Sequence, residues 1–460
     1  MMNRRRFLTS CAAGLAGAAA APLLGRSPRQ PRSFGRAKRV IMIHMAGAPS
    51  QLDLFTPKPE LVKHHLQPCP DELLQNERFA FIKGHPKMLG SPYKFERHGQ
   101  SGAWLSELLP ETAKVADEIA FVHSMKTEQF NHAPAQIHLF TGHGLPGRPS
   151  MGAWLSWGLG TENLDLPAFV VLTSGPFAPD GGASLWGPGF LPSLHQGVRL
   201  RSQGDPVLHL ANPPGMAPES RRRSLDALRA LNQESGSRHG DPETNTRIEQ
   251  YELAWRMQSS VPELADLSTE SQATLDLYGV KPGEASFAGN ALLARRLSER
   301  GVRVVQLHHW GWDSHGTSPG DDIITSLPER CRQTERACAA LVLDLKQRGL
   351  LDETIVVWTG EFGRTPMNEE RGGSQYLGRD HHPHCFSLWV AGGGFKPGGT
   401  MGETDELGYH VLGAPATAND LHASMLHLLG VDHEKLTYRY MGRDFRLTDV
   451  AGELLDPILA

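Results

Sequence analysis

The sequence lacks the charge imbalance that is typical of nucleic-acid-binding proteins. Its 460 residues carry a formal net charge of −4 with histidine neutral, and its lysines and arginines form no basic stripe. Because nucleic-acid binding usually needs clustered basic residues, we expect no nucleic-acid partner. No segment after residue 30 is apolar enough to predict a membrane-spanning helix, so we expect no integral membrane segment once the leader is removed. The length allows one large domain with insertions or two ordinary domains.

Cysteine is scarce and poorly spaced for a structural role. The sequence has 5 cysteines, of which Cys11 lies in the leader described below. No two of the others have the spacing of a metal finger. Cys331 and Cys338 lie on one expected helix, where their separation spans about 10 Å, too far for a disulfide bond. We therefore expect Cys69, Cys331, Cys338 and Cys385 to be buried free thiols.

Histidine, in contrast, is abundant. There are 22 histidines, and several are adjacent in sequence: His64-His65, His308-His309 and His381-His382. Because neutral imidazole is the commonest side-chain ligand of metal ions, this abundance favours a metal site. The 49 glycines and 33 prolines indicate many turns around a compact sheet.

The first 30 residues have the pattern of a twin-arginine signal peptide. Three arginines follow Asn3 and precede Phe7, and a short run of small apolar residues extends from Cys11 to Leu24. The alanines in this run suit a cleavage site. We therefore expect residues 1–30 to direct export of the folded chain to the periplasm or the exterior. The alternative is a chance cluster of arginines before an alanine-rich helix.

Residues 36–455 alternate between strand-like and helix-like segments. Short apolar runs predict strands at 39–45, 119–123, 168–173, 302–307, 354–358 and 386–391. Helical spacing of apolar residues predicts helices at 105–116, 131–142, 286–300, 323–348 and 419–429. This alternation predicts an α/β fold, with a doubly wound, mostly parallel sheet and helices on both faces.

Two stretches interrupt the alternation. Residues 57–100 are rich in proline, histidine and lysine without a clear period, and we expect an irregular excursion over the functional site. Residues 214–285 are polar and have helical spacing at 224–231, 242–259 and 268–277. We expect either an inserted helical subdomain or helices packed on one face of the sheet.

Acidic and imidazole side chains follow two of the expected strands. Asp313 and His315 come just after the strand at 302–307, and side chains two apart in an extended segment point the same way. Glu361 and Arg364 come just after the strand at 354–358. Because doubly wound sheets bind ligands at the carboxyl ends of their strands, we expect one shared site. The alternatives are a turn cap with a solvated histidine, and a loop-closing ion pair.

The densest group of potential ligands is Asp380, His381, His382 and His384. Adjacent side chains diverge, so these residues cannot all bind one ion. We expect His381 to be a metal ligand, and Asp380 to bind the metal or to orient His381. A solvated, histidine-rich loop is the alternative.

A third group lies at the start of the expected helix at 131–142. Asn131 and His132 would occupy the helix N-terminus, where backbone amides and the helix dipole favour an anion. His132 is a candidate acid, base or ligand, or only a polar residue that begins the helix. Asp53 follows the turn after the first strand and is a further candidate ligand. Arg364 and Arg379 are candidate anion-binding residues, because guanidinium groups grip oxyanions in a fork.

Together these motifs resemble the alkaline phosphatase/sulfatase superfamily. A closer resemblance is to a secreted, twin-arginine, sulfatase-like family of unknown function in bacteria with many sulfatases (domain of unknown function 1501). The segments that carry the resemblance span nearly the whole chain after the leader: Met45–Pro59, Asn131–Gly142, Gly311–Gly316, Gly360–Pro366, Gly378–Pro383 and Asp420–Phe445.

The resemblance implies a divalent metal ion, with Zn, Mn and Ca as the candidates. It implies that the ligands are Asp313, His315, Glu361 and His381, and that Asp53 and Asp380 are further candidates. Superfamily enzymes also have an adjacent pair of acidic residues after the first strand. This sequence lacks that pair, unless Asp53 folds back to supply it.

The sequence departs from the catalytic pattern at the nucleophile. Sulfatases carry Cys or Ser followed by x-Pro-x-Arg, and the same register here begins at His132 and ends at Gln136. Phe362 stands where superfamily enzymes have a further histidine ligand. His132 therefore stands at the nucleophile position. The resemblance implies that a metal-bound water could replace the missing nucleophile, with His132 as a general base or as a covalent phosphoryl acceptor.

Three hypotheses follow. The first is an exported, metal-dependent hydrolase of sulfate or phosphate esters, acting on a small-molecule or glycan ester that Arg364 or Arg379 holds. The second is a catalytically inactive superfamily member that binds a glycan or a protein partner. The third is a metal-dependent transferase or mutase with the same fold.

Overall fold

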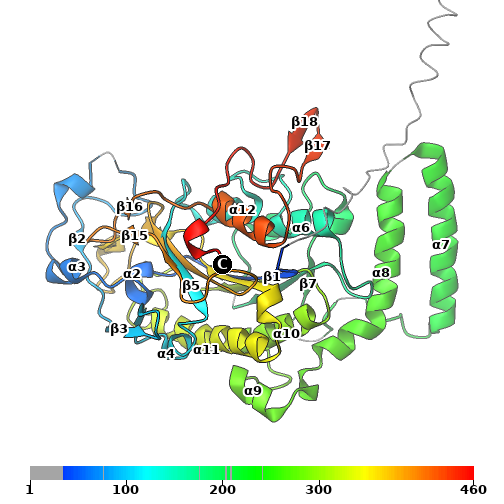
Figure 1. The fold of residues 1–460 in the computed structure, drawn as a ribbon, viewed down its shortest axis with the longest axis horizontal. Helices are drawn as coiled ribbons and strands as arrows, with labels where there is room; N and C mark the ends of the chain where they lie inside the picture. Colours follow the sequence, from blue (N-terminus) through cyan, green and yellow to red (C-terminus); the bar gives the residue numbers. More distant parts are fainter. Residues whose placement is uncertain (1–34, 76, 176, 202–204, 208–209, 241) are drawn as a thin grey trace, which may run out of the picture.

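The computed structural model describes residues 35–460 except positions 76, 176, 202–204, 208–209 and 241. The expected signal peptide, residues 1–30, lies outside the described residues. Within them, eight strands form one sheet near the middle of Figure 1. In spatial order the strands are β14 (Thr400–Met401), β5 (Ile119–Met125), β13 (Phe386–Ala391), β9 (Thr354–Thr359), β1 (Arg39–Ala46), β8 (Val304–Trp310), β6 (Phe169–Ser174) and β7 (Val198–Leu200).

The sheet is mostly parallel, which confirms the expected fold. β1 lies between β8 and β9 and is parallel to both, with Val40 opposite Val304 and Ile355. β6 runs parallel to β8, and β7 runs parallel to β6. β13 is antiparallel to both of its neighbours, β5 and β9. Because β1, β8 and β9 run side by side in one direction, the segments that follow them leave the sheet at the same edge.

Helices cover both faces of the sheet, as predicted (Figure 1). One face is covered by α4 (Pro110–Ala113), α9 (Gln272–Tyr278), α10 (Phe287–Glu299) and α11 (Ser326–Gln347). The other is covered by α5 (His132–Thr141), α6 (Met151–Leu159) and α12 (Ala418–Leu428).

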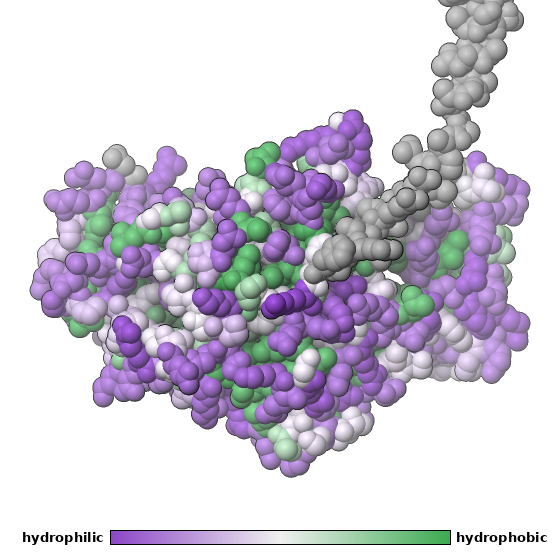
Figure 2. All heavy atoms as spheres, viewed as in Figure 1, coloured by the Kyte–Doolittle hydropathy of each residue, from purple (hydrophilic) through white to green (hydrophobic). Residues whose placement is uncertain are grey.

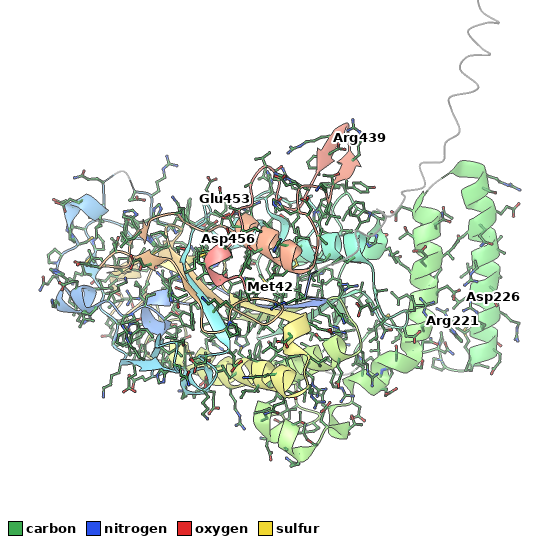
Figure 3. All side chains as sticks on the ribbon, in the orientation of Figure 1. Met42, Arg221, Asp226, Arg439, Glu453 and Asp456 are labelled. Atoms are coloured by element: carbon green, nitrogen blue, oxygen red, sulfur yellow. The ribbon has the colours of Figure 1, made fainter. Side chains whose placement is uncertain are left out.

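Alternate residues of β1 face the two hydrophobic cores, because successive side chains of a strand point to opposite faces. Ile41 and Ile43 are fully buried in the core beneath α10 and α11. Val40 and Met42 are fully buried in the core beneath α6 and α12. Figure 3 places Met42 in the middle of the molecule. β1 therefore contributes to both cores, as its neighbours β8 and β9 also do.

The polar segment at 214–285 contains two long helices. α7 (Pro218–His239) and α8 (Pro242–Ala265) lie side by side at one end of the molecule, and Figure 3 labels Arg221 and Asp226 on α7. Met257 and Val261 of α8 join the core beneath α10 and α11, whereas α7 packs chiefly against α8. The segment is thus attached through α8, and α7 stands outside the sheet layers.

One expected helix is mostly a different structure. The helix predicted at 105–116 is limited to α4, and its first two residues belong to β4 (Ala103–Ser106). β4 pairs with β3 (Phe95–His98), so Leu105 lies opposite Glu96. Pro110 starts α4, because proline has no N–H to donate and suits the first helical position. α6 was not predicted at all.

Shorter elements lie between the main strands and helices. They are α2 (Gln51–Leu54), α3 (Pro59–Lys63), η1 (Asp71–Leu73), β2 (Lys87–Met88), η2 (Gly182–Leu185), η3 (Ser193–His195), η4 (Leu267–Thr269), η5 (Leu351–Glu353), β10 (Gly363–Arg364), β11 (Met367–Asn368), η6 (Arg371–Gly373), β12 (His381–His382), β15 (Glu403–Thr404), β16 (Val411–Leu412), β17 (Tyr438–Tyr440), β18 (Arg443–Phe445) and η7 (Asp456–Ile458).

Hydrophilic residues cover most of the β17–β18 hairpin on the face that Figure 2 shows. In Figure 3, Arg439 on this hairpin lies at the outer edge of the molecule. Across the part of the chain that the structure describes, no helix combines the length and apolarity needed to cross a membrane. The four expected free thiols are Cys69, Cys331, Cys338 and Cys385, and all four are buried and unpaired.

Candidate metal centre

The carboxyl ends of β1, β8 and β9 bring several segments together. Residues 47–53 follow β1, residues 311–316 follow β8, and residues 360–364 follow β9. α5 begins at His132 near the same edge. β12 pairs with β10, which places His381 opposite Arg364. Segments that are far apart in sequence therefore meet at one edge of the sheet, as expected from the topology.

Three imidazole rings point at one carboxylate oxygen, Oδ1 of Asp313. The Nε2 atom of His315 lies 2.8 Å from this oxygen, that of His132 lies 3.2 Å away, and that of His381 lies 3.3 Å away. The potential ligand atoms of these four residues all lie within 4.8 Å of one another. We refer to His132, Asp313, His315 and His381 as the His/Asp cluster.

Each of the three imidazoles is held from behind by its other ring nitrogen. Nδ1 of His132 lies 2.7 Å from Oε1 of Glu361, and Nδ1 of His315 contacts Oε2 of Glu369. Nδ1 of His381 lies 2.7 Å from the backbone oxygen of Phe130. Since all three partners only accept hydrogen bonds when the glutamates are ionised, each Nδ1 carries a proton and donates it. In the neutral rings, the Nε2 lone pairs then point into the cluster.

The cluster fits a divalent metal ion. Nε2 of His132 is buried and has no hydrogen-bond partner among the described residues. A buried nitrogen without a partner typically costs about 1–3 kcal/mol, so a bound ion or substrate is expected to satisfy it. Asp313, His315 and His381 supply the two imidazoles and one carboxylate that commonly hold a divalent metal. The donor types, their orientation and the groups behind them therefore suit a metal ion.

The surroundings shift the pKa values of the cluster residues in different directions. Burial acts to lower the pKa of His132, but the nearby carboxylates of Asp313 and Glu361 raise it to about 9. Burial lowers the pKa of His381 to about 4. Burial alone would raise the pKa of Asp313, but the Arg364 guanidinium and the hydrogen-bonded imidazoles hold it well below its usual value. Without a cation, His132 is therefore the protonated imidazole and Asp313 is ionised.

Glu361 lies behind His132, outside the group of converging ligand atoms. Its side chain is fully buried and accepts hydrogen bonds from the backbone amides of Gly47 and Ala48, at 3.0 and 3.2 Å. Gln136 donates to Oε1 of Glu361 at 2.9 Å, and Nε2 of His44 lies 3.2 Å from Oε2. Burial alone would raise the pKa of Glu361, but the imidazoles of His132 and His44 hold it well below its usual value.

Arg364, a candidate anion-binding residue, is fully buried and directs its guanidinium to the protein itself. Its Nε donates to the oxygen of Ala48 at 2.9 Å, and its Nη1 donates to the oxygen of Arg379 at 3.0 Å. Its Nη2 contacts the oxygen of Gly47 and Oδ1 of Asp313. Arg364 therefore anchors Asp313 to the turn after β1. Its guanidinium is not exposed as a fork that could bind an anion.

The other two acidic candidates also have protein partners. Asp53 pairs with Arg379 through two hydrogen bonds of 2.7 and 3.0 Å, and neither side chain is exposed to solvent. Asp380 accepts hydrogen bonds from the backbone amides of Phe81, Ile82 and His381. Asp380 therefore positions the backbone of His381, in agreement with the orienting role. With His315 and Glu369 it also forms a second, overlapping group of potential ligands.

Asn131 occupies the predicted place, immediately before α5, and is exposed. Its side chain makes no capping hydrogen bond. His132 is the first residue of α5, and its side chain is 16% exposed, compared with 6% for His315 and 2% for His381. Of the three imidazoles, His132 is therefore the most accessible to a substrate.

Glycine allows the segments of the cluster to touch. A Cβ atom on Gly47 would lie 2.5 Å from the backbone nitrogen of Asp313, and Gly47 has a φ of +109°. A Cβ atom on Gly378 would lie 2.0 Å from the backbone carbon of His315. Side chains at these positions would push apart the very segments that carry the ligand atoms.

Several residues that complete the site were not predicted. Glu369 orients His315, and His44 contacts Glu361 as well as His308. The ring of Phe81 packs edge-on against His315 and His381, with centroids 4.9 and 5.4 Å apart. Glu369 and Phe81 follow no predicted strand, so position in the sequence gave no signal for them.

The family model described as "Protein of unknown function (DUF1501)" matches residues 37–459. The chain belongs to this family. None of the functionally curated proteins matches the sequence.

Three solved structures illustrate the likeness in fold. The sulfatase PsFucS1 from Pseudoalteromonas sp. is 12% identical, with 94% of this chain and 73% of that chain covered and a TM-score of 0.34. A phosphonate monoester hydrolase from Silicibacter pomeroyi is 12% identical, with 92% and 76% covered and a TM-score of 0.33. The alkaline phosphatase from the Antarctic bacterium TAB5 is 10% identical, with 85% and 98% covered and a TM-score of 0.32. At this level of similarity they say nothing of what the chain does.

The buried pair of Asp53 and Arg379 gives a stability prediction. Burial opposes ionisation of Asp53, but Arg379 and Ser50 lower its pKa. A lowered pKa contributes stability above the unfolded value, near 3.9, and this contribution is lost as the pH falls towards the folded value. Asp53→Asn leaves an unpaired buried guanidinium, so we expect a loss of about 3–5 kcal/mol in the free energy of unfolding at pH 7. Urea unfolding between pH 3 and 7 measures both effects.

Asp226→Asn is the matched control for that variant. Asp226 has an exposed ion pair with Arg222, so the same change should cost less than about 1 kcal/mol. A double variant, Asp53→Asn with Arg379→Met, should be more stable than the sum of the single variants predicts. Equal losses for Asp53→Asn and Asp226→Asn would contradict the structural role of the buried pair.

Proposed function

We propose that the protein is a metal-dependent hydrolase of sulfate or phosphate esters. The observation that carries this proposal is the convergence of three Nε2 atoms on Asp313, each imidazole being held by an acceptor behind its Nδ1. Buried imidazoles that are oriented in this way are typical of metal ligands. The resemblance of the sequence motifs to sulfatases and alkaline phosphatases supports ester hydrolysis as the reaction.

We assign ligation of the metal to Asp313, His315 and His381. Three protein ligands leave a coordination position open, which is a property of catalytic sites, whereas four are typical of structural sites. Two imidazoles and one carboxylate suit Zn or Mn better than Ca, which prefers oxygen ligands. Of the three metals that the sequence suggests, Zn and Mn therefore fit this donor set.

The cation, when bound, would polarise an ester oxygen and lower the pKa of a water molecule towards neutrality. The chain itself would supply the proton. During hydrolysis water adds to sulfur or phosphorus and the bond to the alcohol oxygen breaks. His132 would give this oxygen a proton from Nε2, because the buried Glu361 carboxylate behind Nδ1 stabilises the protonated ring. Glu361 fixes the orientation of the ring throughout.

A second candidate function is a binding protein without catalysis. It is favoured by Phe362, whose ring lies 5.0 Å from that of His132 and 4.6 Å from that of His381. An apolar ring thus occupies the position of a superfamily ligand. In this alternative a metal would stabilise the cluster, and the protein would bind a glycan or a protein partner.

We also propose that the protein is exported through the twin-arginine pathway to the periplasm or the exterior. It rests on the arginine motif and the short apolar run within residues 1–30. This pathway carries folded proteins, so a metal could be bound before export.

The metal content of the exported full-length protein tests the ligand assignment. We expect about one Zn or Mn per chain, and at least tenfold weaker binding after Asp313→Ala or His381→Ala, because each variant removes a ligand. His64→Ala is the control, since His64 is exposed and outside the cluster. Elemental analysis after dialysis measures the content, and aryl sulfate and aryl phosphate esters measure turnover. Metal-free protein would refute the proposed hydrolase, whereas metal without turnover would favour the binding protein.

His132 has a separate signature. We expect His132→Ala to keep its metal but to lower kcat by about 10²–10⁴-fold, because a general acid contributes roughly this much. Glu361→Gln should lower kcat in the same direction. The comparison is with His381→Ala, measured for metal content and kcat on the same ester. If His132→Ala loses metal as His381→Ala does, His132 is a fourth ligand and not the acid.

Fractionation of the native host tests export. Replacing Arg4 and Arg5 with lysine should leave the protein in the cytoplasm, because the pathway reads the arginine pair. Arg36→Lys is the control and should be exported like the unchanged chain. Undiminished export of the Arg4→Lys/Arg5→Lys variant would rule out this pathway.

A further inference from the structure

A cavity of about 700 Å³ lies at the carboxyl ends of β6 and β8. Its walls come from the end of β6 at Thr173–Gly175, from His309 of β8, from the end of α9, and from the starts of α10 and α11. Figure 1 shows α9, α10 and α11 together on one side of the sheet. The cavity therefore occupies the usual place of a ligand in this architecture, one strand away from the cluster.

The cavity is strongly basic. Arg330, Arg332 and Arg336 line it, and no described lining residue is an aspartate or glutamate. Arg332 has an ion pair with Glu329, and Arg336 donates to the backbone oxygens of residues 276 and 277. The Nε atom of Arg330 is buried and has no hydrogen-bond partner among the described residues. Three cations and an unpaired buried N–H favour a bound oxyanion.

Two further donors face the same cavity. Ser286 caps the N-terminus of α10, a helix of 13 residues, and Phe287 and Ala288 of its first turn line the cavity. The positive end of the helix dipole therefore lies at the cavity wall. Nδ1 of His309 accepts a hydrogen bond of 3.1 Å from Trp312, so the neutral ring carries its proton on Nε2. The His309 ring also bonds the side chain of Gln333 in the cavity wall, and an anion would compete with this side chain.

The cavity and the cluster share one loop. His309 lines the cavity and Asp313 belongs to the cluster, and four residues span at most about 14 Å. A Cβ atom on Gly311, between them, would lie 2.9 Å from Nε of Arg330. Trp310 packs against Phe177 with ring centroids 4.7 Å apart, and Phe177 is 64% exposed. An apolar surface thus lies beside the loop that joins the two sites.

We propose that the cavity binds a second oxyanion of the substrate, a sulfate or phosphate group, while the first lies at the His/Asp cluster. The preferred substrate is then an ester that carries at least two such groups, as a multiply sulfated glycan does. Phe177 and Trp310 offer a face for the ring between the groups. This inference rests on the proposed function for the first group, but binding of an anion in the cavity does not require turnover.

Titration calorimetry of the full chain with inorganic sulfate tests the proposal. After removal of metal, the wild type should bind one sulfate. Arg330→Gln, Arg336→Gln and the double variant should each bind it at least about tenfold more weakly, because each loses charged hydrogen bonds. Arg439→Gln is the control, since Arg439 is an exposed arginine on the β17–β18 hairpin. His381→Ala, which alters the cluster, should leave sulfate binding unchanged.

Thermal unfolding of each variant shows whether weaker sulfate binding comes from the lost side chain or from misfolding. One arginine variant with the Tm of the wild type is sufficient for the test. The proposal would be overturned if His381→Ala abolished sulfate binding and Arg330→Gln left it intact. It would also be overturned if the wild type showed no saturable sulfate binding. Binding in the cavity without turnover of any ester would sustain this inference and refute the hydrolase. With turnover, Arg330→Gln should raise KM for a disulfated aryl ester and leave that for a monosulfated one unchanged. An equal rise for both would also overturn it.

Discussion

The arrangement depends on one partly buried carboxylate, that of Asp313, and on the residues that hold it. Its Oδ1 atom contacts the Nε2 atoms of three imidazoles and the guanidinium of Arg364. Arg364 is itself fixed to the turn after β1, so the loop after β8 cannot move independently of the strand beside it. The parallel order of β1, β8 and β9 makes this meeting possible, because all three strands end at the same edge. A rigid ligand geometry follows from the sheet, not from the loops alone.

Buried arginines and glutamates hold the residues around this centre in place. Arg379 bonds Asp53 and two backbone oxygens, while Glu361 and Glu369 each hold an imidazole by Nδ1. Charges buried in this way are stable only in pairs, so the site and the fold support each other. The arginines of the neighbouring cavity differ, because they line open space and Arg330 keeps an unpaired Nε. The paired cations hold the site together, whereas the arginines that line the cavity leave room for an anion.

Much of the fold could be predicted, because apolar runs of strand length and helical spacing give the order of elements directly. The carboxyl-end rule also brought Asp313 and His315 to one edge of the sheet from the sequence alone. His381 was predicted from the dense group of potential ligands and from the family resemblance. The rule does not predict which carboxylate points into the cluster. We therefore expected Glu361 to be a ligand, whereas it lies behind His132. Nor could it assign Arg364 and Arg379, because a guanidinium that binds backbone oxygens has the same sequence signal as one that binds an anion. Glu369 and Phe81 depend on tertiary packing of loops, for which local pattern carries no information.

The most direct test of the central claim is a crystal structure of the Zn- or Mn-loaded protein, with the metal located by anomalous scattering. The account predicts one strong peak about 2.0–2.2 Å from Nε2 of His315, Nε2 of His381 and an oxygen of Asp313. The Nδ1 atoms should remain bonded to Glu369 and to the backbone oxygen of Phe130. A metal bound elsewhere, or coordination through Nδ1 of either histidine, would contradict the account.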